Sequence, residues 1–145
     1  MPARKVDMEA LYAVRGKVKN ALKSSLSECL KNAEVNDIIS ILGCGIKDNY
    51  DSSKLNYGKV AVATDGDTDG YNIMCLIATL FWVLMPNFIK EGRLCWLRAP
   101  LYRLQKGNER VFAYNDEELK ELRKTHKNWI QGRNKGYEVV WPLSL

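Results

Sequence analysis

The feature that most constrains the fold is a short apolar run that leads directly into a row of carboxylates. Residues 59–64 (Lys-Val-Ala-Val-Ala-Thr) are small or β-branched, which is typical of a strand buried on both faces of a parallel sheet. Residues 65–70 (Asp-Gly-Asp-Thr-Asp-Gly) follow at once, and the apolar stretch from Asn72 to Met85 predicts a buried helix closed by Pro86. This order places the acidic turn beyond the carboxyl end of a strand, where ligands gather in open α/β sheets.

The remaining patterns extend this unit into an α/β fold. Strand, helix and strand in succession predict a βαβ unit with a right-handed crossover. Asp69 is expected to cap the buried helix. The other predicted elements are a helix over Ser27–Leu42 capped by Ser27 and stopped by Gly43-Cys44-Gly45, a strand over Gly92–Arg98, a hairpin of Leu101–Leu104 and Arg110–Tyr114, and a charged helix over Asp116–Lys127 that starts after Asn115.

Composition narrows the functional classes. The chain has 145 residues, of which 46% are hydrophobic and 27% charged, as in one ordinary soluble domain. Its longest apolar run, Ile73 to Pro86, is shorter than the roughly 20 residues of a membrane-spanning helix, so we expect a cytoplasmic protein with no membrane partner. Four scattered cysteines without a C-x-x-C pair, and His126 as the single histidine, argue against a zinc site or a disulfide framework.

The acidic turn predicts a metal site. Asp65, Asp67 and Asp69 stand at every second position, and like charges this close repel each other unless a divalent cation neutralises them. Hard oxygen ligands of this kind select Mg²⁺, Mn²⁺ or Ca²⁺. The alternative is a solvated acidic turn whose aspartates only cap the following helix.

Three chemistries compete for this turn. A calcium EF-hand loop would need a bidentate Glu where Leu76 stands and a helix before the loop. A haloacid-dehalogenase-type phosphatase would use Asp65 as nucleophile and Asp67 as acid, but would carry Thr or Val in place of Asp69 and a second acidic motif downstream. A metal site for phosphodiester chemistry agrees with the net charge of +5 and with the basic first 31 residues, which hold seven Lys or Arg and three acids.

Six short blocks follow one another along the chain. They are Arg15-Gly16-Lys17, Leu42-Gly43-Cys44-Gly45-Ile46, Thr64-Asp65-Gly66-Asp67-Thr68-Asp69-Gly70, Met85-Pro86, Glu91-Gly92-Arg93 and Ala99-Pro100-Leu101-Tyr102. In order and spacing they resemble the TOPRIM region of type IIA DNA topoisomerases, in the B-type subunits of gyrase and topoisomerase IV and their phage relatives. The resemblance covers roughly residues 9 to 115.

The resemblance implies a TOPRIM fold, which is a Rossmann-like α/β domain with a small parallel sheet flanked by helices. The family's first strand is expected to be lacking here. The resemblance also implies that Asp65 and Asp67 are Mg²⁺ ligands, with Mn²⁺ able to replace Mg²⁺, and that Asp69 is a supporting carboxylate.

An activity is implied as well. Lys17, with Arg15 and Asn20, would approach the DNA backbone near the cleaved bond, and the implied catalytic groups are Lys17 and the first two aspartates of the turn. The family's reaction is transesterification, in which a tyrosine on a partner A-type subunit attacks a phosphodiester, a second duplex passes and the break is resealed. The implied partners are DNA, that A-type subunit and the ATPase remainder of the B-type subunit, and ATP acts only through a domain outside this chain.

Two departures from the family pattern set limits on this activity. The family's other metal-binding acid is a Glu in an E-G-D-S-A motif upstream of Arg15-Gly16-Lys17, and that motif is not present. Glu91-Gly92 does not replace it, because Arg follows and the position lies far downstream. Family members also continue from the charged helix into an R-Y-K-G-L-G segment that we do not find. We therefore expect a fragment, a split subunit or a degenerate relative that is inactive on its own.

The expected organisation is a basic segment over residues 1–12, a TOPRIM-like metal- and DNA-binding domain over residues 13–115, and a C-terminal helix and tail over residues 116–145. Two other functions stay open. One is a metal-dependent phosphatase or nuclease that uses the first two aspartates of the turn. The other is a catalytically silent remnant that binds DNA or a partner. Tyr102 is interpreted as a packing residue and not as a DNA nucleophile, because no base neighbours it.

Overall fold

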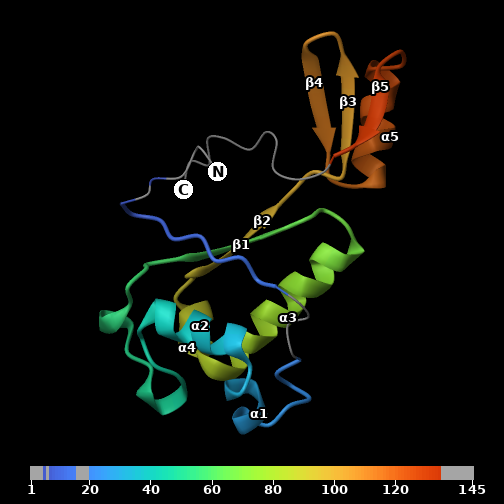
Figure 1. Cartoon of the computed structure of the whole chain (residues 1–145). Helices are drawn as coiled ribbons and strands as arrows, with labels where there is room; N and C mark the ends of the chain where they lie inside the picture. Colours follow the sequence, from blue (N-terminus) through green and yellow to red (C-terminus); the bar gives the residue numbers. More distant parts are fainter. Residues whose placement is uncertain (1–4, 6, 16–19, 135–145) are drawn as a thin grey trace. The chain divides into compact units, whose positions relative to one another are not determined.

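The computed structural model describes residues 5, 7–15 and 20–134, and these form two compact units (Figure 1). The first unit contains the described residues up to Ala61 together with Cys75–Cys95. The second contains Val62–Met74 and the described residues from Trp96 onward.

In the middle of the chain, one strand is followed by two helices and then by three strands. The helices are α1 (Leu26–Leu30), α2 (Ala33–Leu42), the short 3-10 helices η1 (Lys47–Asn49) and η2 (Ser52–Lys54), α3 (Thr68–Leu84), α4 (Pro86–Lys90) and α5 (Asp116–Thr125). The strands are β1 (Val60–Thr64), β2 (Leu94–Arg98), β3 (Tyr102–Lys106), β4 (Glu109–Ala113) and β5 (Ile130–Arg133).

The first helical region differs from the sequence prediction. One helix starting at Ser27 is wrong, because Ser25 caps α1 through a capping box with Glu28, and α1 ends within five residues. Asn32 then caps α2 by accepting a hydrogen bond from the amide of Val35 at 3.1 Å. The predicted stop is confirmed, since Gly43 ends α2 in the left-handed conformation at φ 70°.

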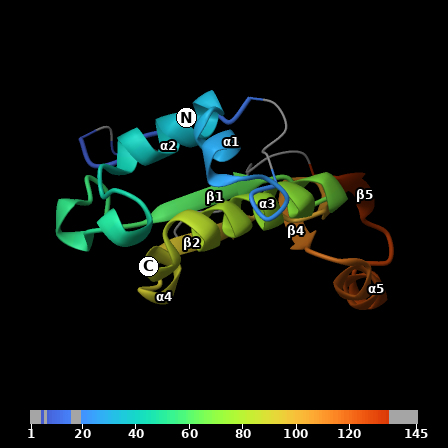
Figure 2. The ribbon, with the colours of Figure 1, turned by 90° about the horizontal axis from the view of Figure 1, so that it is seen from below.

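The core of the first unit forms around the C-terminal part of α3. Figure 2 shows α1 and α2 on one side of this part of α3 and α4 on the other. The ring centroids of Phe81 and Phe88 lie 5.1 Å apart. Leu84 and Met85, which stand between these two residues in the sequence, are also fully buried. As predicted, α3 ends just before Pro86, at Leu84. Pro86 is itself the first residue of α4, where its missing N–H is not needed.

β1 and β2 form a two-stranded sheet, and the amide of Val60 donates to the carbonyl of Arg93 at 2.8 Å. Val62 and Thr64 are buried, whereas Ala61 and Ala63 are exposed. The sequence predicted a strand buried on both faces, but β1 buries only one face among the described residues. Helix α3 follows from Thr68, four residues earlier than expected.

The second unit contains a three-stranded antiparallel sheet in the order β4-β3-β5. The predicted hairpin is present as β3 and β4, and Figure 1 shows α5 alongside these strands. Asn115 caps α5 as predicted, by accepting from the amide of Glu118 at 2.8 Å. The sequence did not predict β5, which pairs with the free edge of β3 and places Arg133 opposite Tyr102.

Within the part of the chain that the structure describes, no helix is long and apolar enough to cross a membrane.

Candidate metal and DNA-binding site

The acidic turn after β1 is closed tightly by two glycines. A Cβ added at Gly66 would collide with the carbonyl oxygen of Ala99, and one added at Gly70 would collide with the carbonyl oxygen of Asp65. Because backbone occupies the space that a side chain would need, the turn accepts only glycine at these two positions without a shift of the chain. The two glycines of the motif therefore fix how the aspartates between and beside them are presented.

Asp67, and not Asp69, caps helix α3. Its Oδ1 accepts a hydrogen bond from the amide of Gly70 at 3.0 Å, and its carbonyl accepts one from the amide of Tyr71 at 3.0 Å. The prediction that Asp69 caps the helix is wrong, since Asp69 already lies in the first turn, where its exposed carboxylate favours the helix dipole. Asp65 is also exposed, at the end of β1.

Arg133 approaches the same aspartate from β5. Its Nη2 donates to Asp67 Oδ2 at 3.1 Å, so the two oxygens of Asp67 have different partners. Sequence analysis missed this residue because 66 residues separate the pair and β5 itself was not predicted. The signal is tertiary, since Arg133 reaches the turn only through the pairing of β5 with β3.

A shallow depression of the second unit contains this ion pair and a second arginine. The guanidinium of Arg98 lies 5.7 Å from the ring centroids of both Tyr71 and Tyr114, and its Nη2 donates to the Tyr114 carbonyl at 2.8 Å. Its Nε is buried without a hydrogen-bond partner in the described chain. The depression is lined by Gly66, Asp67, Thr68, Tyr71, Arg98, Leu101, Tyr102, Tyr114, Asn115, Asp116 and Arg133.

The end of β1 is anchored beside the turn by an aromatic pair. The indole Nε1 of Trp96 donates to Thr64 Oγ1 at 3.0 Å. The Trp96 ring meets Tyr71 edge to face, with centroids 4.6 Å apart. These contacts hold the strand end that presents Asp65 against the first turn of α3.

Tyr102 is part of the wall of the depression. Its hydroxyl donates to Asp116 Oδ1 at 2.7 Å, and this hydrogen bond raises the pKa of Tyr102 above its ordinary value, with desolvation as a smaller cause. The half-buried side chain is therefore fixed by a hydrogen bond as well as by its place in β3.

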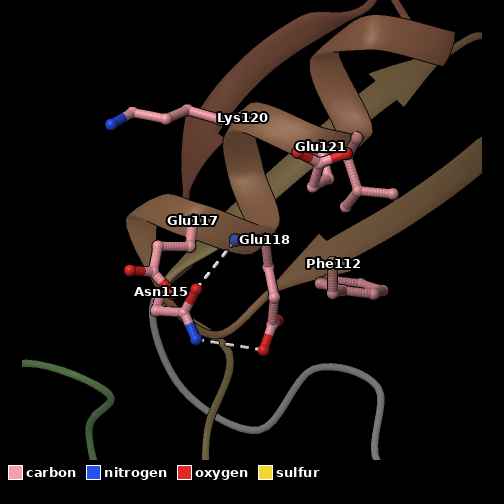
Figure 3. A pocket seen from close by; sticks show the side chains of 7 residues that line it. Phe112, Asn115, Glu117, Glu118, Lys120 and Glu121 are labelled. Carbon is pink, nitrogen blue, oxygen red and sulfur yellow. Dashed lines mark hydrogen bonds between the residues drawn. The ribbon is translucent and has the colours of Figure 1, made fainter.

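A second hollow of this unit lies over α5 and β4 (Figure 3). Asn115 contacts Glu118 there through both its oxygen and its nitrogen. Three glutamates line the hollow, so its charge opposes a DNA phosphate and it is not part of the candidate site. Its lining residues are Phe112, Asn115, Glu117, Glu118, Lys120, Glu121 and Leu122.

Two of the residues expected to contact DNA, Arg15 and Asn20, belong to the described part of the first unit. Lys17 lies outside the described residues, so its predicted role stays a prediction. Arg15 is exposed. The Oδ1 of Asn20 accepts from the amide of Leu22 at 3.1 Å, which leaves its amide nitrogen as the donor for a phosphate. The DNA roles of Arg15 and Asn20 also stay predictions.

The carboxylates of the turn suit a magnesium ion that shares its ligands with a substrate. Among the described residues, no three His, Cys, Asp or Glu side chains gather in a way that could enclose a metal. Mg²⁺ does not require such a cage, because it usually binds one or two carboxylates and completes its shell with water and substrate phosphates. Asp65 and Asp67 provide such a pair of hard oxygen donors, so the donor set fits Mg²⁺.

Comparison with known proteins identifies the family to which the chain belongs. Residues 3–95 match the Toprim domain family, and the chain belongs to that family. The predicted family and the predicted fold class, a small parallel sheet flanked by helices, are confirmed.

Similar proteins include B-type subunits of DNA gyrase and of DNA topoisomerase 4. The chain is 42% identical over 131 residues to the B-type subunit of DNA gyrase from Thermotoga maritima, a match that covers 90% of the chain and 20% of that protein. It is 36% identical over 148 residues to the B-type subunit of DNA topoisomerase 4 from Rickettsia typhi, a match that covers 99% of the chain and 22% of that protein. The chain therefore spans about a fifth of the length of these relatives.

A solved structure shares the fold. It is the Plasmodium falciparum topoisomerase II DNA-binding, cleavage and re-ligation domain, with a TM-score of 0.72 and 27% sequence identity. The match covers 85% of this chain and 18% of the other. The expected limits of the three segments of the chain stay a prediction.

Proposed function

We propose that this chain is the Toprim part of an ATP-dependent type II DNA topoisomerase and that it supplies Mg²⁺ ligands and DNA-backbone contacts for double-strand cleavage and religation. Its similarity to gyrase and topoisomerase IV B-type subunits supports this proposal. The single observation that carries it is the acidic turn, in which glycine-closed backbone presents Asp65 and Asp67 at the end of a strand.

Asp65 and Asp67 would hold the metal in this proposal. When bound, Mg²⁺ would stabilise the negative charge that grows on the phosphate and on the leaving 3′ oxygen. The chain itself orients Asp67, since the Gly70 amide fixes one carboxylate oxygen and the Arg133 guanidinium contacts the other. Asp65 follows the anchored end of β1, and its exposure leaves room for a substrate phosphate.

The DNA contacts of the proposal come from residues 15–20. Arg15 and Lys17 would neutralise backbone phosphates near the bond that is cut, and Asn20 would donate to a phosphate oxygen. Contacts of this kind position DNA and carry no sequence information. A DNA substrate would place the work of the protein in the cytoplasm of a bacterium, or of a host cell if a phage encodes it.

The proposed activity needs further parts. The cleavage tyrosine would come from an A-type subunit, and ATP would act through the ATPase portion of a B-type subunit. We expect the chain to be inactive on its own, because the acidic turn offers metal ligands but no nucleophile for DNA.

The test is reconstitution with an A-type subunit and the remainder of a B-type subunit, measured as ATP-dependent relaxation of supercoiled DNA. The variant is Asp65→Asn, because this side chain does not cap α3 and its loss of charge should leave the turn folded. We expect relaxation to fall by about 100-fold or more, as for the loss of a group that acts on transition-state charge. Asp48→Asn, at an exposed aspartate of the first unit, is the matched control and should keep full activity.

Other outcomes would favour the alternatives. If the chain alone hydrolyses p-nitrophenyl phosphate and Asp65→Asn abolishes this, the chain is a metal-dependent phosphatase. If the reconstituted wild type relaxes DNA no better than the mixture without the chain, and still binds DNA, it is a binding remnant. Equal relaxation by Asp65→Asn and wild type would remove the metal role from Asp65.

A further inference from the structure

We propose that Arg133 and a divalent cation are alternative partners of Asp67. Arg133 neutralises Asp67 when no metal is bound, and it weakens the binding of metal because the cation must displace it. This inference rests on the metal site of the proposed function. It assigns a role in setting metal affinity to a residue outside the acidic turn and outside the proposed DNA contacts at residues 15–20.

The first support is how the two oxygens of Asp67 are divided. The Gly70 amide holds Oδ1, and the Arg133 guanidinium holds Oδ2 at 3.1 Å. A cation that binds Asp67 without breaking the helix cap would have to use the oxygen that Arg133 now contacts. Two positive groups on one oxygen repel each other, so the guanidinium and the cation exclude one another.

The second support is that Arg133 has a backbone fixed by strand pairing and a side chain that is largely exposed. Its place in β5 is set by the pairing with β3, opposite Tyr102. Its side chain is 60% exposed, whereas that of Asp67 is 31% exposed. The guanidinium can therefore swing into solvent when a cation arrives, while the carboxylate stays where the helix cap holds it.

The third support is the strength of the contact. An ion pair this exposed is weak, so a divalent cation can displace Arg133 from Asp67. Breaking the ion pair still reduces the net binding free energy of the cation. From the usual strength of such pairs, we expect removal of Arg133 to tighten Mg²⁺ binding by about two- to five-fold. A weakly held ion suits a site whose remaining ligands come from the substrate.

The test is a Mg²⁺ titration of the full chain at fixed ionic strength, followed by calorimetry and by the NMR signal of the Gly70 amide. The variant is Arg133→Gln. The matched control is Arg110→Gln, which removes the same charge from an exposed position on β4. Arg110 pairs with Gln105, three residues along β3 from Tyr102, so it lies roughly 10 Å along the strand from the row of Arg133.

Tighter Mg²⁺ binding by Arg133→Gln, with Arg110→Gln equal to wild type, supports the inference. Equal or weaker binding by Arg133→Gln, while wild type binds Mg²⁺, overturns it and leaves the metal site of the proposed function standing. If neither wild type nor Arg133→Gln responds to millimolar Mg²⁺, the metal site and the inference both fail. Circular dichroism and thermal unfolding of each variant show whether it is folded, and Mn²⁺ broadening of the Gly70 signal gives a second reading of the same site.

Discussion

Among the described residues, the first unit contains nearly all of the large, fully buried side chains. The second unit instead fixes the side chains around the acidic turn through hydrogen bonds and an ion pair. Of the largest side chains with almost no exposure among the described residues, only Leu104 belongs to the second unit. The others, all in the first unit, are Phe81, Phe88, Leu80, Leu84, Met85, Val35, Cys29 and Cys44.

This difference shows that the stability of the fold and the positioning of the site side chains depend on different interactions. Burial of apolar surface stabilises a fold without fixing directions, because the hydrophobic effect is not directional. Hydrogen bonds fix directions but contribute only about 1 kcal/mol each to net stability. The acidic turn belongs to the second unit, where contacts such as Gly70 to Asp67 and Trp96 to Thr64 place side chains at defined distances.

The largest effect should come from the core of the first unit. Phe88→Ala removes a fully buried ring that contacts Phe81, and we expect a loss of about 3–5 kcal/mol in the free energy of unfolding, measured in urea. Trp82→Ala is the control, because Trp82 is 53% exposed and should cost less than about 1 kcal/mol despite its Lys90 neighbour. Similar losses in both variants would show that this core does not carry the stability of the unit.

A smaller effect is expected at the turn. Gly70→Ala places a Cβ against the Asp65 carbonyl, so the backbone must shift, and we expect a loss of about 1–3 kcal/mol together with weaker Mg²⁺ binding. Gly58→Ala is the matched control, since an added Cβ would meet no described atom within 4 Å apart from its chain neighbours. It should be neutral or stabilising by under about 1 kcal/mol. Unchanged stability and metal affinity in Gly70→Ala would contradict the close packing of the turn.

The cap of α5 should contribute about 1 kcal/mol. Asn115→Ala leaves the Glu118 amide without its partner and also removes the contact of the two side chains. Asn128→Ala, at an exposed asparagine beyond the helix, is expected to change the free energy of unfolding by less than about 0.5 kcal/mol. Urea unfolding followed by helical circular dichroism measures both. A larger effect at Asn128 than at Asn115 would contradict the cap.

The smallest effect is a pH dependence at Tyr102. The folded pKa lies above the ordinary value of 10.0 because the protonated hydroxyl donates to Asp116, so the neutral form is favoured in the folded state. Its contribution is fully present below about pH 10 and is lost as the pH rises through the folded pKa. Tyr102→Phe should therefore flatten the alkaline fall in stability, measured by urea unfolding at several pH values.

Asp116→Asn offers a second check of this contact, because it weakens the acceptor and should flatten the same part of the profile. If Tyr102→Phe keeps the full alkaline slope of wild type, the hydrogen bond does not account for that slope.

Much of the fold could be predicted because its signals are local. The β1 strand, the acidic turn and α3 follow from an abrupt change of pattern within about 25 residues. The hairpin of β3 and β4 closes through Gly107, whose φ of 59° suits glycine, and Asn115 stands alone at the start of a charged helix.

The errors in the predicted helix caps arose where two neighbouring residues could each cap the same helix. Ser25 and Ser27 are both good caps, and the choice falls to Ser25 because Glu28 stands three residues later to complete the box. Asp67 and Asp69 are likewise both able to cap α3, and the tight closure at Gly70 favours Asp67. Propensity names the candidates, but the path of the backbone selects between them.

The part of the site that could not be predicted depends on distant pairing. β5 contains Gly132 and lacks a clear alternation, so only the open edge of β3 makes it a strand. Arg133 and the depression around Arg98 follow from that pairing and from contacts that no motif records. The predicted metal roles of Asp65, Asp67 and Asp69 and the predicted role of Lys17 stay predictions.

The double engagement of Asp67 has a consequence for how this position tolerates substitution. An asparagine there could still accept the Gly70 amide, since asparagine caps helices as well as aspartate does. An alanine would lose the cap and the charge together. The helix thus requires only an oxygen at position 67, whereas the proposed chemistry requires a negative charge, so a survey of variants scored for folding and one scored for activity would rank asparagine at opposite ends.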